Sequence, residues 1–332
     1  MVSPEAKPVG LPLALSEIVR AATVRYYDIG EVSRWRNNTR GLVNRSFEID
    51  NRFFLTIYKN RTREELEADA QIANNMDTAI PIARPKRGRE GYSLQTLDGP
   101  ILLTPKLPGI HFVGTKHTDK HPIPEALHSS LATFYWRLQE GLSSAPDDLK
   151  AQLTNASRET IGKMPERIPE IAKPLEKYAP FQGIPAFKYP DLIHDDLERQ
   201  NILSVDGEIT GVVDLDSIRS GDILYEFGHF LFNNVFCDPQ ATRSTAMFYI
   251  DTLKKAGIIR LEDIPSIYGH IYRFAVSDIV DFEDLRQNFR GNPDDIIDIK
   301  LLVKQYERAL GFAADVFDIQ SVQRILFDKN VE

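Results

Sequence analysis

The chain contains a single cysteine, Cys237, among its 332 residues, which excludes an internal disulfide and favours a reducing compartment. No run of about 18 apolar residues occurs, so we expect no membrane-spanning helix. The N-terminal stretch MVSPEAKPVGLPLALSEIV has neither a basic segment nor a long apolar one, so we expect no signal peptide. These absences favour a cytoplasmic protein without a membrane partner.

An excess of positive charge is also lacking. The chain carries 40 Lys and Arg against 48 Asp and Glu, a net charge of -8. Nucleic-acid phosphates require a basic surface, so we expect no nucleic-acid partner. As a binding partner, a cationic or neutral small molecule fits the negative net charge better, and so does an anion that binds together with its own metal ion. The pattern G-x-x-x-x-G-K-[S/T] is absent, which excludes a P-loop nucleotide site.

The length exceeds that of a single core, so two lobes are expected. Short β-rich runs fill residues 30–58, with a polar turn at Asp50 and Asn51, and further strands are predicted over 80–109. Helical spacing covers 62–76 and 122–142 and dominates again after residue 222, the run 192–214 being the exception. The sequence predicts an α+β fold: a small β-rich N-terminal lobe (1–104) with one helix, then a larger, mainly helical lobe (105–332). The stretch TPKLPG, 104–109, is the expected joint.

The segment LIHDDLERQN, residues 192–201, places many ionisable side chains directly before an apolar hairpin. The dipeptide Asp-Gly at 206–207 predicts a two-residue type I′ turn. Pairing outward from this turn sets Asn201 opposite Val212, with Asp214 on the same face as Asn201. Amide and carboxylate oxygens without neighbouring Cys or His suit Mg²⁺ and leave positions open for phosphate. The hairpin therefore predicts a magnesium site at its open end.

The same segment fits the kinase catalytic-loop pattern H-R-D-L-x-x-x-N at His194, Asp196, Leu197 and Asn201, except that Asp195 replaces the arginine. Phosphoryl transfer needs metal ions to neutralise charge and a carboxylate to accept the proton of the attacking hydroxyl. The alternative is an acidic loop that only caps a turn. It does not explain why Asp196 and Asn201 are expected close to a third polar residue, Asp214, which follows the hairpin.

These motifs resemble the superfamily of aminoglycoside phosphotransferases, choline kinases and type II homoserine kinases. GLVNRSFEIDNRFFLTIYKN resembles the homoserine kinase branch, and VVDLDSIRSGDILYEFGHFLF the N-acetylhexosamine kinase branch; together the similar blocks span about residues 28–235. The resemblance implies a bilobal protein-kinase-like fold, ATP and Mg²⁺ as cofactors, and transfer of the γ-phosphate to a hydroxyl. It makes Asp196 the base, Asn201 and Asp214 the metal ligands, and His194 a structural brace.

The resemblance also implies a nucleotide site in the first lobe, with adenine near 104–107. The expected contacts are Gly41, Asn44, Arg45, Ser46, Thr56, Thr104, Lys106 and Leu107. Most superfamily members hold the phosphates with a Lys or Arg in the third strand, where this chain has Thr56. Arg45 is a possible replacement, and either Glu67 or Asp69 could be the partner carboxylate of the following helix.

The acceptor remains open at this stage, with homoserine or another amino alcohol ahead of a sugar and of an aminoglycoside. Asp216 has the strand parity to assist the metal or the acceptor. The remaining candidate acceptor contacts are Glu226, Asp278 and Asp281, with Asp284 beside them, although the stretch 278–288 is also explained by an amphipathic helix. The alternative role expected of Glu226 is to cap or brace the loop that carries Asp196. A nucleotide-binding pseudokinase with a regulatory role is the alternative function. The pair His117 and His121 is interpreted as surface, and the oligomeric state is not predicted.

Overall fold

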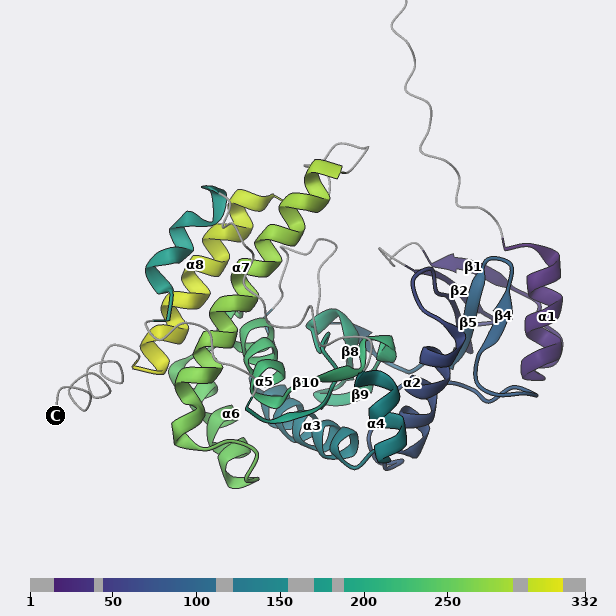
Figure 1. Cartoon of the computed structure of the whole chain (residues 1–332), viewed down its shortest axis with the longest axis horizontal. Helices are drawn as coiled ribbons and strands as arrows, with labels where there is room; N and C mark the ends of the chain where they lie inside the picture. Colours follow the sequence, from purple (N-terminus) through teal and green to yellow (C-terminus); the bar gives the residue numbers. More distant parts are fainter. Residues whose placement is uncertain are drawn as a thin grey trace, which may run out of the picture. The chain divides into compact units, whose positions relative to one another are not determined.

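A computed structural model describes residues 15–38, 44–111, 122–154, 170–180, 188–288 and 298–318. The chain divides into two compact units (Figure 1): residues 1–74 with 83–106, and residues 75–82 with 107–332. The first unit is built on a β-sheet with two helices, and helices dominate the described part of the second unit, as the predicted α+β class requires.

The first unit is built on an antiparallel sheet with the strand order β1-β2-β3-β5-β4. Its strands are β1 (Trp35–Asn38), β2 (Arg45–Ile49), β3 (Phe53–Ile57), β4 (Leu94–Thr96) and β5 (Gly99–Pro105). The β2–β3 hairpin turns at Asp50 and Asn51, whose φ angles of 50° and 58° are both left-handed. This is the geometry of a type I′ turn, and it confirms the predicted hairpin.

Two helices, not one, accompany this sheet: α1 (Glu17–Tyr27) and α2 (Arg63–Asn75). The helix predicted over 62–76 is confirmed, whereas α1 was missed. The sequence signal for α1 is local, because the hydroxyl of Ser16 caps the helix by accepting from the amide of Val19 at 3.3 Å.

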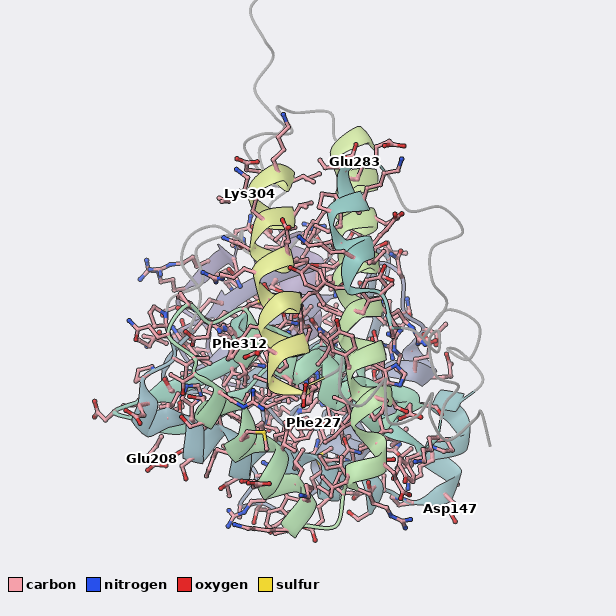
Figure 2. All side chains as sticks on the ribbon, turned by 90° about the vertical axis from the view of Figure 1, so that its left-hand side faces the viewer. Asp147, Glu208, Phe227, Glu283, Lys304 and Phe312 are labelled. Carbon is pink, nitrogen blue, oxygen red and sulfur yellow. The ribbon has the colours of Figure 1, made fainter. Side chains whose placement is uncertain are left out.

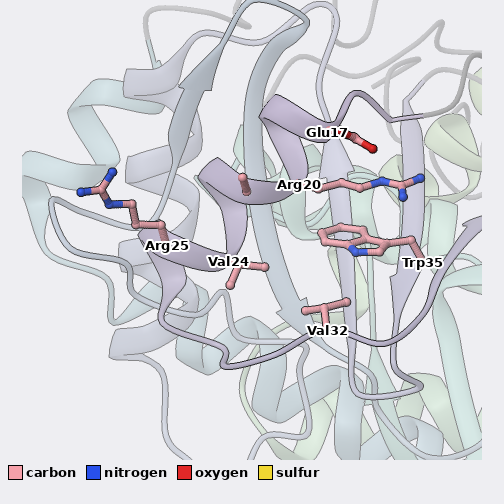
Figure 3. A pocket seen from close by; sticks show the side chains of 7 residues that line it. Glu17, Arg20, Val24, Arg25, Val32 and Trp35 are labelled. Atoms are coloured by element: carbon pink, nitrogen blue, oxygen red, sulfur yellow. The ribbon is translucent and has the colours of Figure 1, made fainter.

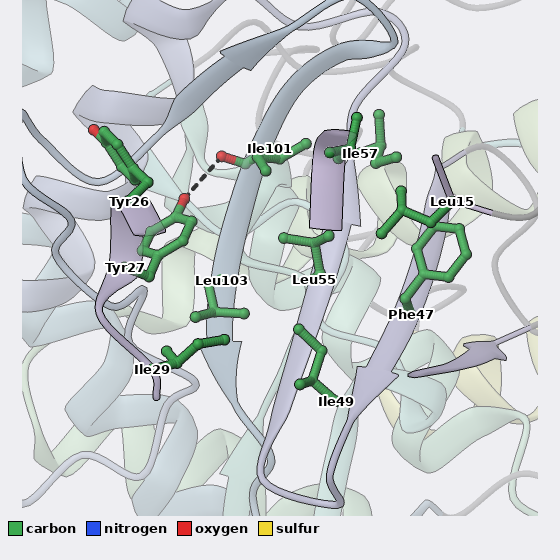
Figure 4. Close-up of a cluster of buried hydrophobic side chains, with 11 residues drawn as sticks. Leu15, Tyr26, Tyr27, Ile29, Phe47, Ile49, Leu55, Ile57, Ile101 and Leu103 are labelled. Atoms are coloured by element: carbon green, nitrogen blue, oxygen red, sulfur yellow. Dashed lines mark hydrogen bonds between the residues drawn. The ribbon is translucent and has the colours of Figure 1, made fainter. Parts of the chain in front are cut away.

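Alternation along the strands gives the sheet two distinct faces. Figure 4 shows the α1 face, where the core is closed by Tyr27, whose hydroxyl donates to the carbonyl of Ile101 at 3.1 Å. The strand residues of this core are Phe47, Ile49, Leu55, Ile57, Ile101 and Leu103. On the opposite face, Leu66 and Ala70 of α2 contact Tyr58 and Leu102. Ser46 and Thr56 share this second face, since they pair in register with each other and Thr56 pairs with Leu102.

The described helices of the second unit are α3 (Glu125–Ser143), α4 (Asp147–Thr154), α5 (Ile223–Leu231), α6 (Arg243–Lys255), α7 (Ile264–Asn288) and α8 (Ile299–Val316). Shorter helical turns are η1 (Glu170–Tyr178), η2 (Arg199–Asn201), η3 (Leu215–Ser217), η4 (Phe232–Phe236) and η5 (Leu261–Asp263). Its strands are β6 (Ile110–His111), β7 (Pro190–Ile193), β8 (Ile202–Val205), β9 (Glu208–Val212) and β10 (Arg219–Asp222).

Helix α5 forms the centre of this unit because its sequence, ILYEFGHFL, is apolar on nearly every side. Phe227, Phe230 and Leu231 are at most 1% exposed. Figure 2 views the unit from the side on which α7 and α8 lie side by side, with Phe227 of α5 labelled. No helix in the described ranges is long and apolar enough to cross a membrane.

The β8–β9 hairpin confirms the predicted turn, with positive φ at Asp206 (49°) and Gly207 (88°). The register next to the turn is also as predicted, with Val205 opposite Glu208 and Ser204 opposite Ile209. Beyond it the prediction was wrong: Ile202, not Asn201, faces Val212. A bulge at Thr210 adds one residue to β9, so the parity argument that put Asp214 on the face of Asn201 does not hold.

Candidate functional site

The loop from His194 to Asn201 connects β7 to β8 and is held from within by its first residue. The ring of His194 is fully buried, and its Nδ1 accepts from the backbone amide of Asp196 at 3.3 Å. An accepting Nδ1 carries no proton, so the neutral ring is protonated at Nε2. This contact supports the bracing role expected of His194.

Asn201 closes the same loop from its other end. Its side-chain Nδ2 donates to both the carbonyl and the carboxylate Oδ2 of Asp196, each at 2.8 Å. The two donations fix the Asp196 carboxylate and use the amide nitrogen of Asn201. The amide oxygen of Asn201 is therefore the atom with the chemistry to bind a cation.

Asp214 is brought to this end of the hairpin by the backbone. The amide of Val213 donates to the carbonyl of Asn201 at 2.9 Å, and Asp214 is the residue that follows this contact. Asp214 is exposed and has a left-handed backbone, with φ 66° and ψ 50°. Such a conformation costs an ordinary residue on the order of 1–3 kcal/mol and is concentrated at functional sites. Asp216 follows in η3.

An amide oxygen and a carboxylate are hard ligands that fit Mg²⁺ with phosphate oxygens and water completing its coordination. Within the described residues, no three His, Cys, Asp or Glu side chains gather in a metal-binding arrangement. Asn201 and Asp214 therefore stay the predicted ligands of the metal ion.

Asp195, which stands where the kinase pattern has arginine, is held at both its backbone and its side chain. Its φ of 64° is left-handed, its amide donates to Oε2 of Glu226 at 3.0 Å, and its carboxylate pairs with Arg219. Arg219 lies on β10, directly opposite Ile193 at the end of β7. The ion pair therefore connects the loop from His194 to Asn201 with the segment that follows Asp214.

Glu226 was expected either to contact the acceptor or to brace the loop from His194 to Asn201, and the structure supports the second role. The side chain is on the buried helix α5, 2% exposed, beneath the loop. Burial raises the pKa of Glu226 to about 7, although His229 and Arg219 act in the opposite direction. Glu226 is a buried support for the backbone of Asp195.

Arg199 anchors the middle of the loop in the π-helical turn η4. It is 2% exposed; its Nε donates to the carbonyl of Asn233 at 2.8 Å, and its Nη2 to that of Asn234 at 3.4 Å. Nη2 also lies 3.4 Å from Oδ2 of Asp238. A π-turn changes the carbonyl directions of a regular helix and is frequent at functional sites. No local sequence pattern predicted this turn.

Glu198 also contacts side chains of α5 and η4. Its Oε1 lies 3.5 Å from Nε2 of His229 and accepts from Nδ2 of Asn233 at 3.3 Å. Burial on its own lowers the pKa of His229, but the carboxylates of Glu198 and Glu226 outweigh this effect, and the pKa is raised. The stacked ring of Phe274, with centroids 3.9 Å apart, covers the imidazole. The polar residues of this loop are thus engaged by groups on α5, η4 and β10.

The nucleotide contacts predicted in the first unit fall on different faces. Oγ of Ser46 lies 3.1 Å from Oγ1 of Thr56, a pair of facing hydroxyls on the α2 face of the sheet. Thr104 shares their face and donates to the carbonyl of Phe54 at 3.5 Å. Arg45 has the opposite parity and lies over the ring of Phe47, 5.6 Å from its centroid. Arg45 therefore does not lie beside Thr56, where a residue that replaces the missing lysine is expected.

The remaining nucleotide candidates lie at or beyond the ends of the strands. Lys106 is bound by Glu48, at 3.3 Å, and by Asn51. Leu107 belongs to the second unit, where it contacts Gly211. Asn44 precedes β2. Gly41, like the predicted surface pair His117 and His121, lies outside the described residues.

Both remaining acceptor candidates lie on α7. Asp278 is half-buried and accepts from the hydroxyl of Tyr306 on α8, whereas Asp281 is exposed. Asp284 also falls within this helix. The predicted helix over 278–288 is confirmed as the end of α7.

A separate hollow of about 500 Å³ lies between α1 and β1 (Figure 3). Its residues include Glu17 and Val24, and the guanidinium of Arg20 lies 5.7 Å from the ring of Trp35. None of the predicted site residues lines it.

The comparisons with known proteins identify the family. Residues 34–256, more than half of the chain, match the model of a family described as "Phosphotransferase enzyme family". The chain belongs to this family. Among curated proteins it is 25% identical over 224 residues to a homoserine kinase of Pseudomonas aeruginosa, a match that covers 60% of this chain. The chain spans 64% of the length of that relative.

Solved structures of similar fold include a spectinomycin phosphotransferase in complex with ADP and spectinomycin. This match has a TM-score of 0.60 at 12% identity and covers 92% of this chain and 99% of the other. The GDP complex of an aminoglycoside 2'-phosphotransferase-IIIa has a TM-score of 0.56 at 15% identity, with coverage of 88% and 99%. These likenesses confirm the predicted phosphotransferase fold of this family member.

Proposed function

We propose that the chain transfers the γ-phosphate of ATP to a hydroxyl of a small metabolite in the cytoplasm. The observation that carries the proposal is the double contact from Asn201 to Asp196. It joins the carboxylate that accepts the proton in this proposal to the amide that binds the cation, which is the combination that phosphoryl transfer uses.

Each residue has a defined task in this proposal. Asp196 orients the acceptor hydroxyl and takes its proton at Oδ1 or Oδ2. Asn201 and Asp214 hold Mg²⁺, which when bound neutralises the charge of the nucleotide phosphates. The backbone of 104–107 accepts the adenine. Since positioning and electrostatics dominate such reactions, the rigid support of the loop by Arg199, Glu226 and His194 is part of the machinery.

The acceptor that we place first is homoserine or a related amino alcohol, ahead of a sugar and of an aminoglycoside. The homoserine kinase of P. aeruginosa supports this order, and the acidic side chains of α7 suit an acceptor with an amino group.

A second candidate is a pseudokinase that binds the nucleotide without turnover. It is favoured by Thr56, a neutral residue on the strand where most relatives carry the phosphate-binding cation. Turnover separates the two functions, because a pseudokinase is stabilised by Mg²⁺ and ATP and never consumes the nucleotide.

The test is ADP release in the presence of Mg²⁺ and ATP, against a panel of amino alcohols, sugars and aminoglycosides. The proposal expects acceptor-dependent turnover that falls at least about 100-fold in Asp196→Ala. Asp251→Ala, at a half-exposed carboxylate on α6, is the matched control and should retain activity. Stabilisation by Mg²⁺ and ATP without release of ADP across the panel would favour the pseudokinase.

A further inference from the structure

The face of the sheet that carries Thr56 poses an electrostatic problem for the proposed function. Thr56 and Ser46 contribute only hydroxyl groups, 3.1 Å apart, where a kinase needs a cation for the phosphates. In protein kinases this cation is a strand lysine that forms an ion pair with a carboxylate of the following helix. The question is whether the helix carboxylate persists here and what it binds.

Two carboxylates of α2 were candidates, and the structure separates their roles. The carboxylate of Glu67 accepts from the amide of Tyr92 at 2.8 Å and from that of Ser93 at 2.6 Å. Glu67 is therefore committed to the loop that precedes β4.

Asp69 occupies the side of α2 that faces the sheet. Its helical neighbours Leu66 and Ala70 are fully buried, and both belong to the same apolar cluster as Leu102, the register partner of Thr56. Asp69 itself is 2% exposed. A buried carboxylate is costly unless a cation or strong donors compensate it.

The compensating cation is Arg61, which reaches Asp69 from the segment between β3 and α2. Nη2 of Arg61 donates to Oδ2 of Asp69, and Nε lies 3.4 Å from Oε2 of Glu65. The side chain of Arg61 is 22% exposed against 3% for that of Asp69, so the guanidinium also reaches the surface. A guanidinium has five N–H donors in one plane and can bind a carboxylate and a phosphate at different edges.

We propose that Arg61 is the phosphate-binding cation of this chain and that Asp69 positions it. The inference rests on the proposed function. Asp69 takes the place of the helix carboxylate in the kinase ion pair. Its partner Arg61 belongs to the connection after the third strand, whereas the kinase lysine belongs to the strand itself. Arginine suits this place because its planar donors match phosphate oxygens in pairs.

The two predicted cations of this unit, Arg45 and Lys106, are worse placed. Arg45 lies on the α1 face, over Phe47. Lys106 is bound by Glu48 and Asn51 at the β2–β3 turn. Lys59 is exposed in the same connection as Arg61 and, within the described residues, forms no ion pair with a carboxylate of α2, which makes it a matched control of equal charge.

The test compares the binding of ADP and of adenosine to the full chain by calorimetry, in Arg61→Gln, Asp69→Asn and Lys59→Gln. Only ADP carries phosphates, so Arg61→Gln should weaken ADP by roughly 10-fold or more and leave adenosine unchanged. Asp69→Asn should show the same selective loss to a smaller extent, and Arg61→Lys should recover part of the ADP affinity because it restores the charge. Lys59→Gln should bind both ligands as the wild type does.

Unchanged ADP affinity in Arg61→Gln would overturn the inference, as would an equal loss of ADP and adenosine, which indicates a merely structural residue. The proposed function would survive both results, because ADP would still bind to the wild type. A wild type that binds neither ligand would overturn the proposed function and the inference together.

Discussion

The side chain of Asn201 donates twice to Asp196, once to its carbonyl and once to its carboxylate, at 2.8 Å each. The residue predicted to bind metal therefore also orients the residue predicted to accept the proton. Because one amide group serves both tasks through different atoms, substitutions can separate them.

Asn201→Asp keeps an oxygen ligand for the cation and removes both donations to Asp196. We expect kcat to fall by about 100-fold, the effect of misplacing a reacting group, while the Mg²⁺ concentration for half-activation stays close to that of the wild type. Asn201→Ala removes both tasks, so kcat should fall and the Mg²⁺ requirement should rise. Titrations of activity with Mg²⁺ measure both quantities, with Gln200→Ala as control. An Asn201→Asp variant as active as the wild type would show that Asp196 needs no such orientation.

The ion pair between Asp195 and Arg219 should contribute measurably to stability, since the side chains are only 12% and 31% exposed. The cycle of Asp195→Asn, Arg219→Gln and the double variant isolates this contribution. Asparagine is the suitable replacement because it tolerates the left-handed backbone of position 195. Urea unfolding should give a coupling free energy of roughly 1–2 kcal/mol. A coupling near zero would mean that the pair is solvated like an ordinary surface pair.

Much of this site could be predicted from local sequence, because local rules govern the parts concerned. The Asp-Gly turn at 206–207, the β2–β3 hairpin and the spacing from His194 to Asn201 depend on neighbours in the chain. The bulge at Thr210 could not be predicted, because one extra residue leaves the alternation on either side intact.

Contacts across long stretches of chain were also beyond sequence reasoning. A bracing role for Glu226 could be proposed, but its partner, the amide of Asp195, lies 31 positions away in the chain and could not be predicted. The engagement of Arg199 by η4 requires a π-turn, for which no sequence signal was recognised. The prediction for Arg45 placed it in the loop between the first strands, and it failed because position 45 is already inside β2 and faces α1.

Removing the buried cation of the loop should destabilise the fold strongly. Arg199→Met leaves Asp238 without its ion-pair partner, although the carboxylate still accepts from the amide of Ile123 at 2.7 Å. We expect a loss of about 3–5 kcal/mol in the free energy of unfolding. Adding Asp238→Asn to Arg199→Met should recover part of this loss, because the uncompensated charge is gone. Chemical denaturation measures both variants, and a double variant less stable than Arg199→Met would contradict the charge argument.

Glu226 should make the stability of the fold depend on pH in a defined direction. Its pKa is raised to about 7 by burial, from an ordinary value of 4.5, so between these pH values the folded chain holds a proton that the unfolded chain has lost. The free energy of unfolding therefore falls as the pH rises through this window, and the contribution of Glu226 to stability is complete only below it. The shift corresponds to roughly 3 kcal/mol at most.

Glu226→Gln is the matched variant, since its neutral amide oxygen can still accept from the amide of Asp195. The difference in free energy of unfolding between the variant and the wild type should be small near pH 4.5 and should grow in favour of the variant up to pH 8. Urea unfolding across this range, with Glu262→Gln at an exposed position as control, measures the difference. A difference that does not change with pH would show that Glu226 titrates alike in the folded and unfolded chain.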